Sequence, residues 1–365
     1  MRRLVLVVLS VVTAGDAFTH AQSPSQPLFR SGTTLVEVSA VVTRDGRPVL
    51  DLRPDEVVVL DNGQPQPLVA FEYVDLRDVE GPAQRRDFVL VIDDLHIHPA
   101  RTQATIGAAL AFVDALGPHD RFAFVRTAAS DSVVQFSTDR AAARAFVRAI
   151  RGQSLMVGVV PGELEARTRA SLDVIGQVAA ALRSDAAERR AMLLISEGHP
   201  AFTSEPSSFA SRDAQAVFQQ FLEVLRRAAL ANVAIYTVDP RGLRAESYAS
   251  MPARNMDPGY SAQPSPDNLG AASTHATPRL TSDLSGSLAS LAVNTGGLQA
   301  YWSNDLTRMF PRLFEDSRQY YRLAYAQPDP PAGKKQPLSR SIKVRVARDG
   351  VDVRSRQRYA PVSGR

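Results

Sequence analysis

The segment Phe88–Asp94, FVLVIDD, is a run of five apolar residues that ends in two carboxylates. An apolar run without alternation is typical of a strand that is covered on both faces, as in a parallel sheet flanked by helices. The runs Ala191–Ile195 and Val233–Val238 have the same character, and polar residues follow each of them. The three runs therefore predict strands of one parallel sheet.

Segments with helical periodicity alternate with these strands. Ile106, Leu110, Val113 and Leu116 share one helical stripe, and Gly117 follows where a left-handed glycine commonly ends a helix. The other predicted elements are a strand at 121–125 with a hairpin partner at 133–136, and helices at 139–150, 165–182, 207–230, 284–293 and 305–320, the last interrupted at Pro311. The alternation predicts an α/β fold with a doubly wound, mostly parallel, Rossmann-like sheet.

Both ends of the chain have β character. Residues 34–80 hold apolar runs separated by the turn dipeptides Asp45-Gly46 and Asn62-Gly63, and residues 317–360 alternate around Asp349-Gly350. The simplest arrangement pairs the two end segments in a small β domain. The α/β domain then spans residues 85–316.

The N-terminus has the order of an export signal. Two arginines precede the apolar run Leu4–Val12, and Thr19-His20-Ala21 offers a cleavage site. The run is too short for a membrane anchor, which needs about 20 apolar residues. Residues 1–21 thus predict a signal peptide and residues 22–33 a linker. The expected product is periplasmic or extracellular, with no transmembrane segment after cleavage.

Composition excludes several classes of function. The chain has no cysteine, which excludes thiolate nucleophiles, cysteine zinc sites and a lipoprotein anchor. The formal net charge is only +4, and no basic block with interleaved aromatic residues occurs, so nucleic acid is not an expected partner. Residues 244–279 are rich in Pro, Ser, Ala and Asn and predict a long loop after a strand end.

Polar residues gather at two of the predicted strand ends. Asp93, Asp94, His96 and His98 follow the first strand, and Glu197 and His199 follow the run at 191–195. Carboxylates with imidazoles suit Zn²⁺, Mn²⁺ or Fe²⁺ better than Mg²⁺. Alternation along a continued strand would turn His96 away from Asp93, which favours surface or capping histidines instead. Both interpretations stay open at this point.

Five segments, taken in order, resemble one known family. They are Val59–Gly63, Asp93, Ser196-Glu197-Gly198, Thr295-Gly296-Gly297 and Tyr321–Tyr325. Together they resemble the von Willebrand factor A domain, and more narrowly the exported VWFA-related proteins common in Acidobacteria. The resemblance spans nearly the whole mature chain. It implies a von Willebrand A-type α/β fold and a binding function.

The family's binding site is a metal-ion-dependent adhesion site. It uses an Asp-x-Ser-x-Ser strand end, a loop Thr and a further Asp, all hard oxygen ligands for Mg²⁺ or Ca²⁺. Here Asp93 matches the first Asp, Thr168 stands at a plausible spacing for the loop Thr, and Glu197 replaces the later Asp. Leu95 and Ile97 occupy the two Ser positions. The resemblance therefore implies a degenerate adhesion site.

Three functions follow from these observations. The first is an exported binding module for a protein or cell-surface partner. The second is a metal-dependent hydrolase that uses Asp93, His96, Glu197 and His199. The third is a structural envelope protein without a ligand. No Gly-x-Ser-x-Gly elbow or Gly-rich phosphate loop occurs, so the sequence gives no complete catalytic constellation.

Overall fold

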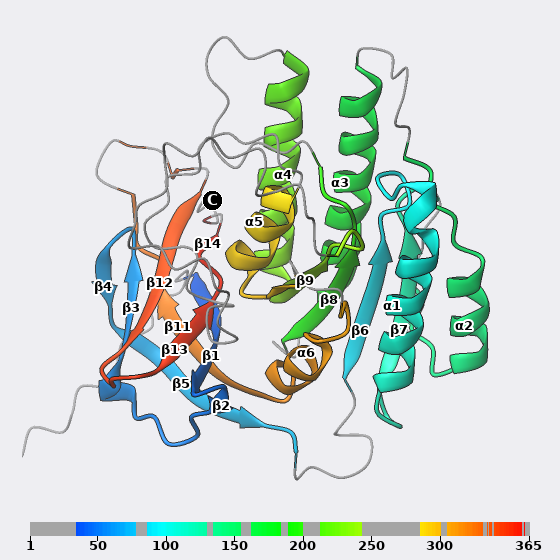
Figure 1. Ribbon diagram of the computed structural model, residues 1–365. Coiled ribbons are helices and arrows are strands. Elements are labelled where there is room, and N and C mark those ends of the chain that lie inside the picture. The colour runs from blue at the N-terminus through cyan, green and yellow to red at the C-terminus, as the bar shows by residue number, and fades with distance from the viewer. Residues whose placement is uncertain are drawn as a thin grey trace, which may run out of the picture. The chain divides into compact units, whose positions relative to one another are not determined.

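The α/β part of the chain is built on a five-stranded parallel sheet with strand order β10-β9-β8-β6-β7. Figure 1 labels its strands β9, β8, β6 and β7. Its strands are β6 (Asp87–Ile92), β7 (Arg121–Arg126), β8 (Arg190–Ile195), β9 (Val233–Val238) and β10 (Gln299–Ala300). Each neighbouring pair runs parallel. The apolar run Phe88–Ile92 is thus an interior strand of a parallel sheet, as predicted.

The structure is a computed structural model, and the residues it describes are 34–77, 86–129, 134–154, 162–183, 189–199, 212–242, 285–300, 305–330, 334, 336–337, 339–359 and 361. The expected signal peptide, the linker and the loop at 244–279 lie outside these ranges.

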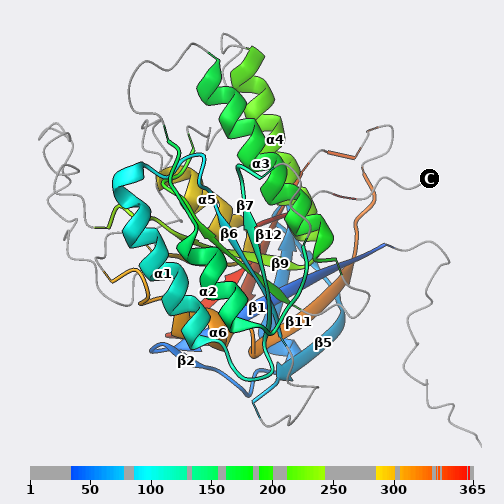
Figure 2. The ribbon, with the colours of Figure 1, turned by 90° about the vertical axis from the view of Figure 1, so that its right-hand side faces the viewer.

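Helices cover both faces of the parallel sheet (Figure 2). Phe88, Leu90 and Ile92 of β6 face one core, and Val89 and Val91 face the other. The first core is completed by α1 (Thr102–Ala115), α2 (Arg140–Arg148) and α6 (Phe310–Asp316); the second by α3 (Glu163–Ala181), α4 (Arg212–Leu230) and α5 (Ser285–Thr295). Burial on both sides explains why β6 is apolar at every position from Phe88 to Ile92.

Strands from both ends of the chain build two antiparallel sheets beside the α/β part. The first has the order β13-β1-β11-β5, with β2 also paired to β1; the second has the order β14-β12-β3-β4. Their bounds are β1 (Leu35–Arg44), β2 (Arg47–Pro48), β3 (Val57–Asp61), β4 (Gln64–Gln66), β5 (Leu68–Asp75), β11 (Gln319–Ala326), β12 (Arg340–Val346), β13 (Asp352–Ser355) and β14 (Arg358–Tyr359). Val38, Val59, Tyr321 and Val344 belong to one shared core between the sheets.

Pairing between the two ends is direct. The N-terminal strand β1 lies between β11 and β13, and β3 pairs with β12, all antiparallel. At the second pair, Asp61 is completely buried and accepts hydrogen bonds from Tyr325 Oη (2.9 Å), Tyr359 Oη (2.7 Å) and Arg340 Nε (2.6 Å). The predicted β unit from both ends is therefore present.

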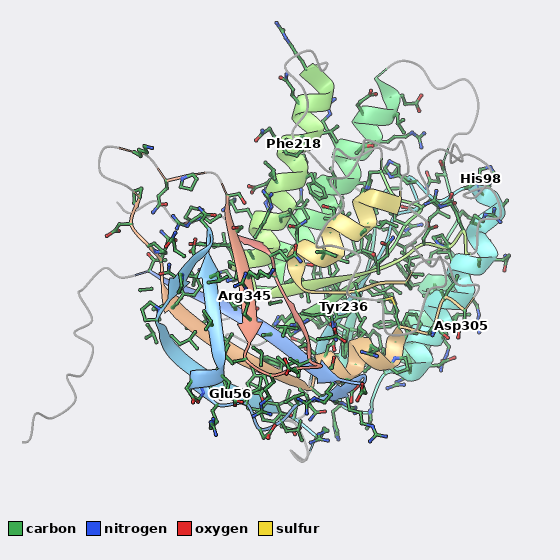
Figure 3. All side chains as sticks on the ribbon, turned by 60° about the vertical axis from the view of Figure 1, so that its left-hand side comes forward. Glu56, His98, Phe218, Tyr236, Asp305 and Arg345 are labelled. Atoms are coloured by element: carbon green, nitrogen blue, oxygen red, sulfur yellow. The ribbon has the colours of Figure 1, made fainter. Side chains whose placement is uncertain are left out.

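A buried polar network joins this β unit to the parallel sheet. Tyr236 of β9, which lies inside the molecule in Figure 3, donates to Asp316 of α6 at 2.7 Å. Arg354 of β13 donates to both oxygens of Asp316, at 2.5 and 2.6 Å. Arg189 donates to Tyr236 Oη at 3.2 Å and to the carbonyl of Gly296 at 2.8 Å. These bonds tie the C-terminal segment to the amino end of the sheet.

Three local predictions were wrong. The helix expected at 305–320 is shorter than predicted. Pro311 lies in the first turn of α6 rather than interrupting a longer helix, and Tyr320 belongs to β11, where it pairs with Val74 of β5. The expected hairpin partner of β7 is reduced to a single bridge between Phe122 and Ser137; Val133 lies outside the described residues. Gly117 is not left-handed, and its N–H donates to Asp120 at 2.6 Å.

Two predicted helix starts, at 207 and 284, also fall outside the described ranges. None of the helices within the described ranges is long and apolar enough to cross a membrane.

Candidate functional site

A tight turn after β6 positions the first part of the site. The strand ends at Ile92, and the carbonyl of Asp93 accepts from the N–H groups of His96 (3.0 Å) and Ile97 (3.1 Å). This turn carries His96 back over the Asp93 side chain. His96 therefore does not point away from Asp93, as was predicted for a strand that continues, because β6 ends at Ile92.

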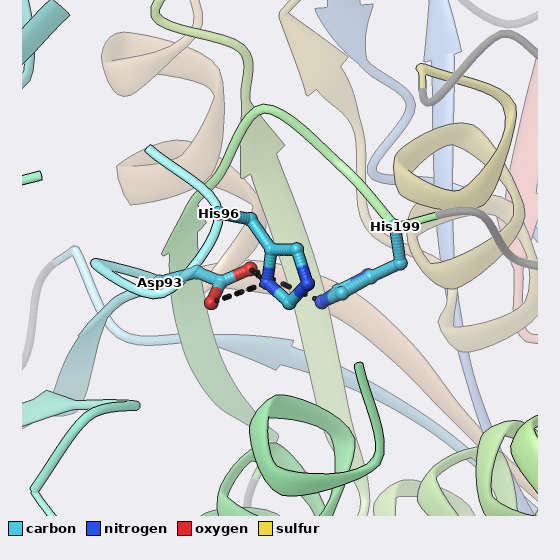
Figure 4. Close-up of side chains that lie close together, drawn as sticks. All are labelled: Asp93, His96 and His199. Carbon is cyan, nitrogen blue, oxygen red and sulfur yellow. Dashed lines mark hydrogen bonds and ion pairs between the residues drawn. The ribbon is translucent and has the colours of Figure 1, made fainter. Parts of the chain in front are cut away.

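The Asp93 carboxylate is completely buried and surrounded by four side chains from three segments. Thr127, which directly follows β7, donates to Oδ1 at 2.8 Å, and Ser196, which directly follows β8, donates to Oδ2 at 2.7 Å. His96 Nδ1 lies 3.0 and 2.9 Å from the two oxygens, and His199 Nε2 lies 3.1 Å from Oδ2 (Figure 4). Three adjacent strand ends thus converge on one carboxylate.

The charge state of the site follows from these contacts. Burial by itself raises the pKa of Asp93, but the imidazoles of His96 and His199 outweigh it and hold that pKa well below the ordinary value. Asp93 is thus a carboxylate at neutral pH. Burial lowers the pKa of His199, so that ring is neutral at pH 7.

His96 and Thr168 meet on the far side of the first imidazole. His96 is nearly buried, and its Nε2 lies 3.4 Å from Thr168 Oγ1. The Thr168 hydroxyl donates its one hydrogen to the carbonyl of Leu164 at 2.8 Å, so towards His96 it offers an acceptor. Thr168 therefore belongs to the surroundings of the site, from helix α3 rather than from a loop.

His199 holds the other side of Asp93. Its Nε2 lies 2.9 Å from Ser171 Oγ as well as 3.1 Å from Asp93, while its Nδ1 has no hydrogen-bond partner among the described residues. A Ser-His-Asp relay requires the hydroxyl on one ring nitrogen and the carboxylate on the other. Here both contact the same nitrogen and Ser171 is completely buried. This trio lacks the geometry of a hydrolase triad.

Asp94 and Glu197 are held elsewhere. Asp94 accepts from the Ala128 N–H at 2.8 Å and from Gln153 Nε2 at 3.3 Å, and Glu197 accepts from the His98 N–H at 2.7 Å. Burial raises the pKa of both carboxyls. Both side chains brace loops at the sheet edge. The group of ligand atoms close enough to share one metal ion comprises only Asp93, His96 and His199 within the described ranges.

The three histidines near the site have different roles. His96 and His199 are 6% and 1% exposed, which contradicts the interpretation of both as surface residues. His98 is the capping residue that this interpretation expected: its Nδ1 accepts from the Ala100 N–H at 3.2 Å, at the start of the 3-10 turn Pro99–Arg101. Figure 3 places His98 near the start of α1.

The ligand set of an adhesion-type Mg²⁺ site does not fit this structure. Leu95 and Ile97 replace its two hydroxyls, and Ile97 is completely buried in the apolar core below. Mg²⁺ prefers six oxygen ligands and keeps several waters. Two imidazoles beside Asp93 oppose that preference. The side chains present at this strand end are thus chemically unsuited to the oxygen coordination of Mg²⁺.

Sequence reasoning missed two contacts of the site. Thr127 is the first residue after β7, so the rule that parallel strand ends converge could have found it. Ser171 lies within α3, and no sequence signal distinguishes it from other helical serines. Ser196 was noted only as part of a motif, whereas its hydroxyl binds Asp93 directly.

Comparisons with known proteins leave the family open. No protein-family model matches the chain, and no curated protein matches it. A search of solved structures finds the crystal structure of an aerotolerance-related membrane protein from Bacteroides fragilis NCTC 9343 with multiple mutations to serines. It is 12% identical, with a TM-score of 0.37, and the match covers 64% of this chain and 98% of that one. An identity and a TM-score as low as these assign neither a family nor a function to this chain.

Proposed function

We propose that this chain is a von Willebrand A-type binding module that captures a protein partner at the carboxyl edge of its parallel sheet. The observation that carries the proposal is an asymmetry in the connections of the sheet. Sixteen residues, 196–211, separate β8 from α4, and 46 residues, 239–284, separate β9 from α5, counted between the described elements.

Connections at the opposite edge are short. Residues 231–232 lead from α4 into β9, residues 296–298 from α5 into β10, and residues 116–120 from α1 into β7. Chain length is thus concentrated at the edge where open α/β sheets bind ligands. Long connections on a rigid sheet supply recognition surface. A purely structural protein has no need for this imbalance.

Recognition at this edge does not use an adhesion cation. Such a cation must stay open to an acidic group of the partner. The Asp93 carboxylate is completely buried and already surrounded by Thr127, Ser196, His96 and His199. The partner is therefore bound by the surrounding connections themselves. The predicted signal peptide supports a partner in the periplasm, at the cell surface or in the medium.

The hydrolase alternative has weaker support. Of its four proposed residues, Glu197 is engaged with the His98 backbone, away from the three-residue group. The remaining three are buried, whereas a hydrolytic centre needs access for substrate. We therefore favour binding over catalysis.

Site-specific photo-crosslinking tests the proposal. A photoreactive residue is placed at Ala100 or Ala128, which are exposed near the carboxyl ends of β6 and β7, and at exposed His119 on the opposite edge as the control. The variants are expressed in the native host and irradiated. We expect one discrete crosslinked protein from the first two positions, competed by excess unmodified chain, and none from His119. Equal yields at both edges, or no competed product from Ala100 and Ala128, would contradict the proposal.

A further inference from the structure

The group formed by Asp93, His96 and His199 contains the donor atoms of a transition-metal site. One carboxylate oxygen and two imidazole nitrogens lie within 4.8 Å of one another, and all three side chains are buried. Figure 4 shows both rings directed at the carboxylate. We propose that this trio binds a single Zn²⁺ ion as a structural site that ties the ends of β6 and β8 together.

The spacing of the donors suits tetrahedral zinc. Bonds of about 2.0–2.1 Å to nitrogen and oxygen place tetrahedral ligand atoms about 3.3 Å apart. Asp93 Oδ2 lies 2.9 Å from His96 Nδ1 and 3.1 Å from His199 Nε2. These two separations need to widen by only a few tenths of an ångström to admit the ion, and the two imidazole nitrogens lie within 4.8 Å of each other. The set resembles the mixed nitrogen and oxygen ligands of known zinc centres.

Thr168 supports His96 as a ligand. When a metal takes the Nδ1 lone pair, the hydrogen of the neutral ring lies on Nε2. Thr168 Oγ1 faces that nitrogen at 3.4 Å as an acceptor, because its own hydrogen goes to Leu164. Metal-bound histidines are generally oriented by such an acceptor on their second nitrogen. The tautomer with its hydrogen on Nδ1, by contrast, would leave Nε2 and the Thr168 oxygen facing each other with no hydrogen between them.

Ser171 occupies the fourth position. Its Oγ lies 2.9 Å from His199 Nε2, on the nitrogen that would bind the metal. The hydroxyl, or a water held by it, completes four-coordination without adding charge. The ring hydrogen of His199 moves to Nδ1 when zinc binds, and Nδ1 has no acceptor among the described residues. The second nitrogen of His96 thus has an acceptor in Thr168, whereas the second nitrogen of His199 has none among the described residues.

The site differs from an adhesion site in what it presents. Asp93 is 0% exposed, so the ion would lie beneath the surface and could not bridge to a partner's carboxylate. Its role is to hold the bases of the connections that leave β6 and β8. This inference is independent of the proposed binding function, because loss of zinc and loss of the crosslinked partner are measured separately.

A direct test uses the full chain with an affinity tag that contains no histidine. The protein is stripped with chelator and titrated with Zn²⁺ against a chromophoric chelator. We expect one equivalent to bind and the melting temperature to rise. Substitution with Co²⁺ should give the visible absorption of a four-coordinate site. Zinc-edge X-ray absorption on the native protein should show two imidazole ligands among nitrogen and oxygen donors.

Matched variants locate the site. His96→Gln and His199→Gln should each weaken Zn²⁺ binding by at least about 100-fold, the upper end of what changes around metal ligands cost. Thr168→Val should weaken it by about 10–100-fold. His98→Gln and Glu197→Gln should leave it unchanged, although both residues are close in sequence. Circular dichroism of each metal-free variant confirms folding.

Several outcomes would overturn the inference. They are absence of stoichiometric Zn²⁺ binding by the native protein, binding that survives in the His96→Gln/His199→Gln double variant, and equal loss in His98→Gln. If the ligand variants fail to fold, the native absorption spectrum decides. A zinc-edge spectrum that shows fewer than two imidazole ligands would also contradict the proposed site.

Discussion

The hydroxyl of Ser196 donates a 2.7 Å hydrogen bond to the carboxylate of Asp93, and so joins the ends of the neighbouring strands β8 and β6. The same hydroxyl accepts from the N–H of Gly198 at 2.9 Å, in the turn that carries His199 inward. One small side chain therefore fixes both the carboxylate and the turn. It stands where the family pattern has a serine or threonine.

Replacing this serine should destabilise the protein. Ser196→Ala leaves a buried carboxylate with one donor fewer and the Gly198 N–H without its acceptor, which we expect to cost about 1–3 kcal/mol. Ser341→Ala, at an exposed hydroxyl, should change the free energy of unfolding by no more than about 0.5 kcal/mol. Urea unfolding measures both. Equal effects of the two substitutions would show that the Ser196 bond contributes nothing of its own.

Asp316 should make stability sensitive to acid. Burial by itself raises its pKa, but the charge and hydrogen bonds of Arg354 outweigh burial and lower the pKa below the ordinary 3.8. The unfolded chain then takes up the proton at higher pH than the folded chain. The contribution of Asp316 is complete above the unfolded pKa and is lost as the pH falls through the lower folded pKa.

The variant Asp316→Asn isolates this contribution. It leaves Arg354 buried without its partner, and we expect a loss of about 3–5 kcal/mol at pH 7. The gap between the native protein and the variant should stay constant from neutral pH to about pH 5 and shrink below about pH 4. Asp114→Asn, which removes an exposed pair with Arg144, should cost about 1 kcal/mol or less. A gap that widens in acid would contradict the assignment.

Gly297 should tolerate no side chain. A Cβ at this position would overlap the backbone carbonyl of Ile235 in β9, and backbone cannot move aside as a flexible side chain can. Gly297→Ala should therefore either prevent folding or lower the melting temperature by many degrees. Gly107→Ala in α1 meets nothing within 4 Å and should stabilise the helix by about 1 kcal/mol. Thermal melts of the two variants should thus shift in opposite directions.

Tyr325 and Tyr359, which both donate to Asp61, should make contributions to the free energy of unfolding that depend on each other. Tyr325→Phe and Tyr359→Phe each remove one of the donors to a completely buried carboxylate, at an expected cost of about 1–3 kcal/mol each. Because both hydroxyls bind the same oxygen, the double variant should differ from the sum of the two by more than about 0.5 kcal/mol. Strict additivity in denaturant unfolding would mean that the two hydroxyls act independently.

Uninterrupted apolar runs were enough to predict the three interior strands of the parallel sheet, whereas the two-residue strand β10 was not expected. A strand covered on both faces is mostly apolar, and β6, β8 and β9 follow that rule apart from Asp87, Arg190 and Thr237. The β unit was predictable for a related reason, since turn dipeptides separate short apolar runs at both ends of the chain. Thr295-Gly296-Gly297 is one of the segments that resemble the von Willebrand A domain, and the structure explains its two glycines. Gly296 has a φ of +78°, and Gly297 lies against the backbone of Ile235.

The ends of helices and strands, and the directions of side chains, were harder to predict from the sequence. The sequence around Tyr320 continues a helical pattern, yet β5 offers a strand partner that makes it extended. His96 was placed on the wrong side because no pattern reveals that β6 stops at Ile92 and turns. Asp94 and Glu197 have the right chemistry for a metal, and only the fold shows them bonded to the Ala128 and His98 backbones.

The sequence by itself determined which polar residues follow the buried strands β6, β8 and β9, because uninterrupted apolar runs mark these strands and parallel strands end at one edge. It also determined that Leu95 and Ile97, which stand at two ligand positions of the adhesion-site pattern that the sequence resembles, carry no ligand atom. Only the tertiary structure decided which polar side chains meet. Asp93, His96 and His199 converge because a backbone turn and a left-handed Gly198 aim them inward, and such angles leave no periodic trace in the sequence.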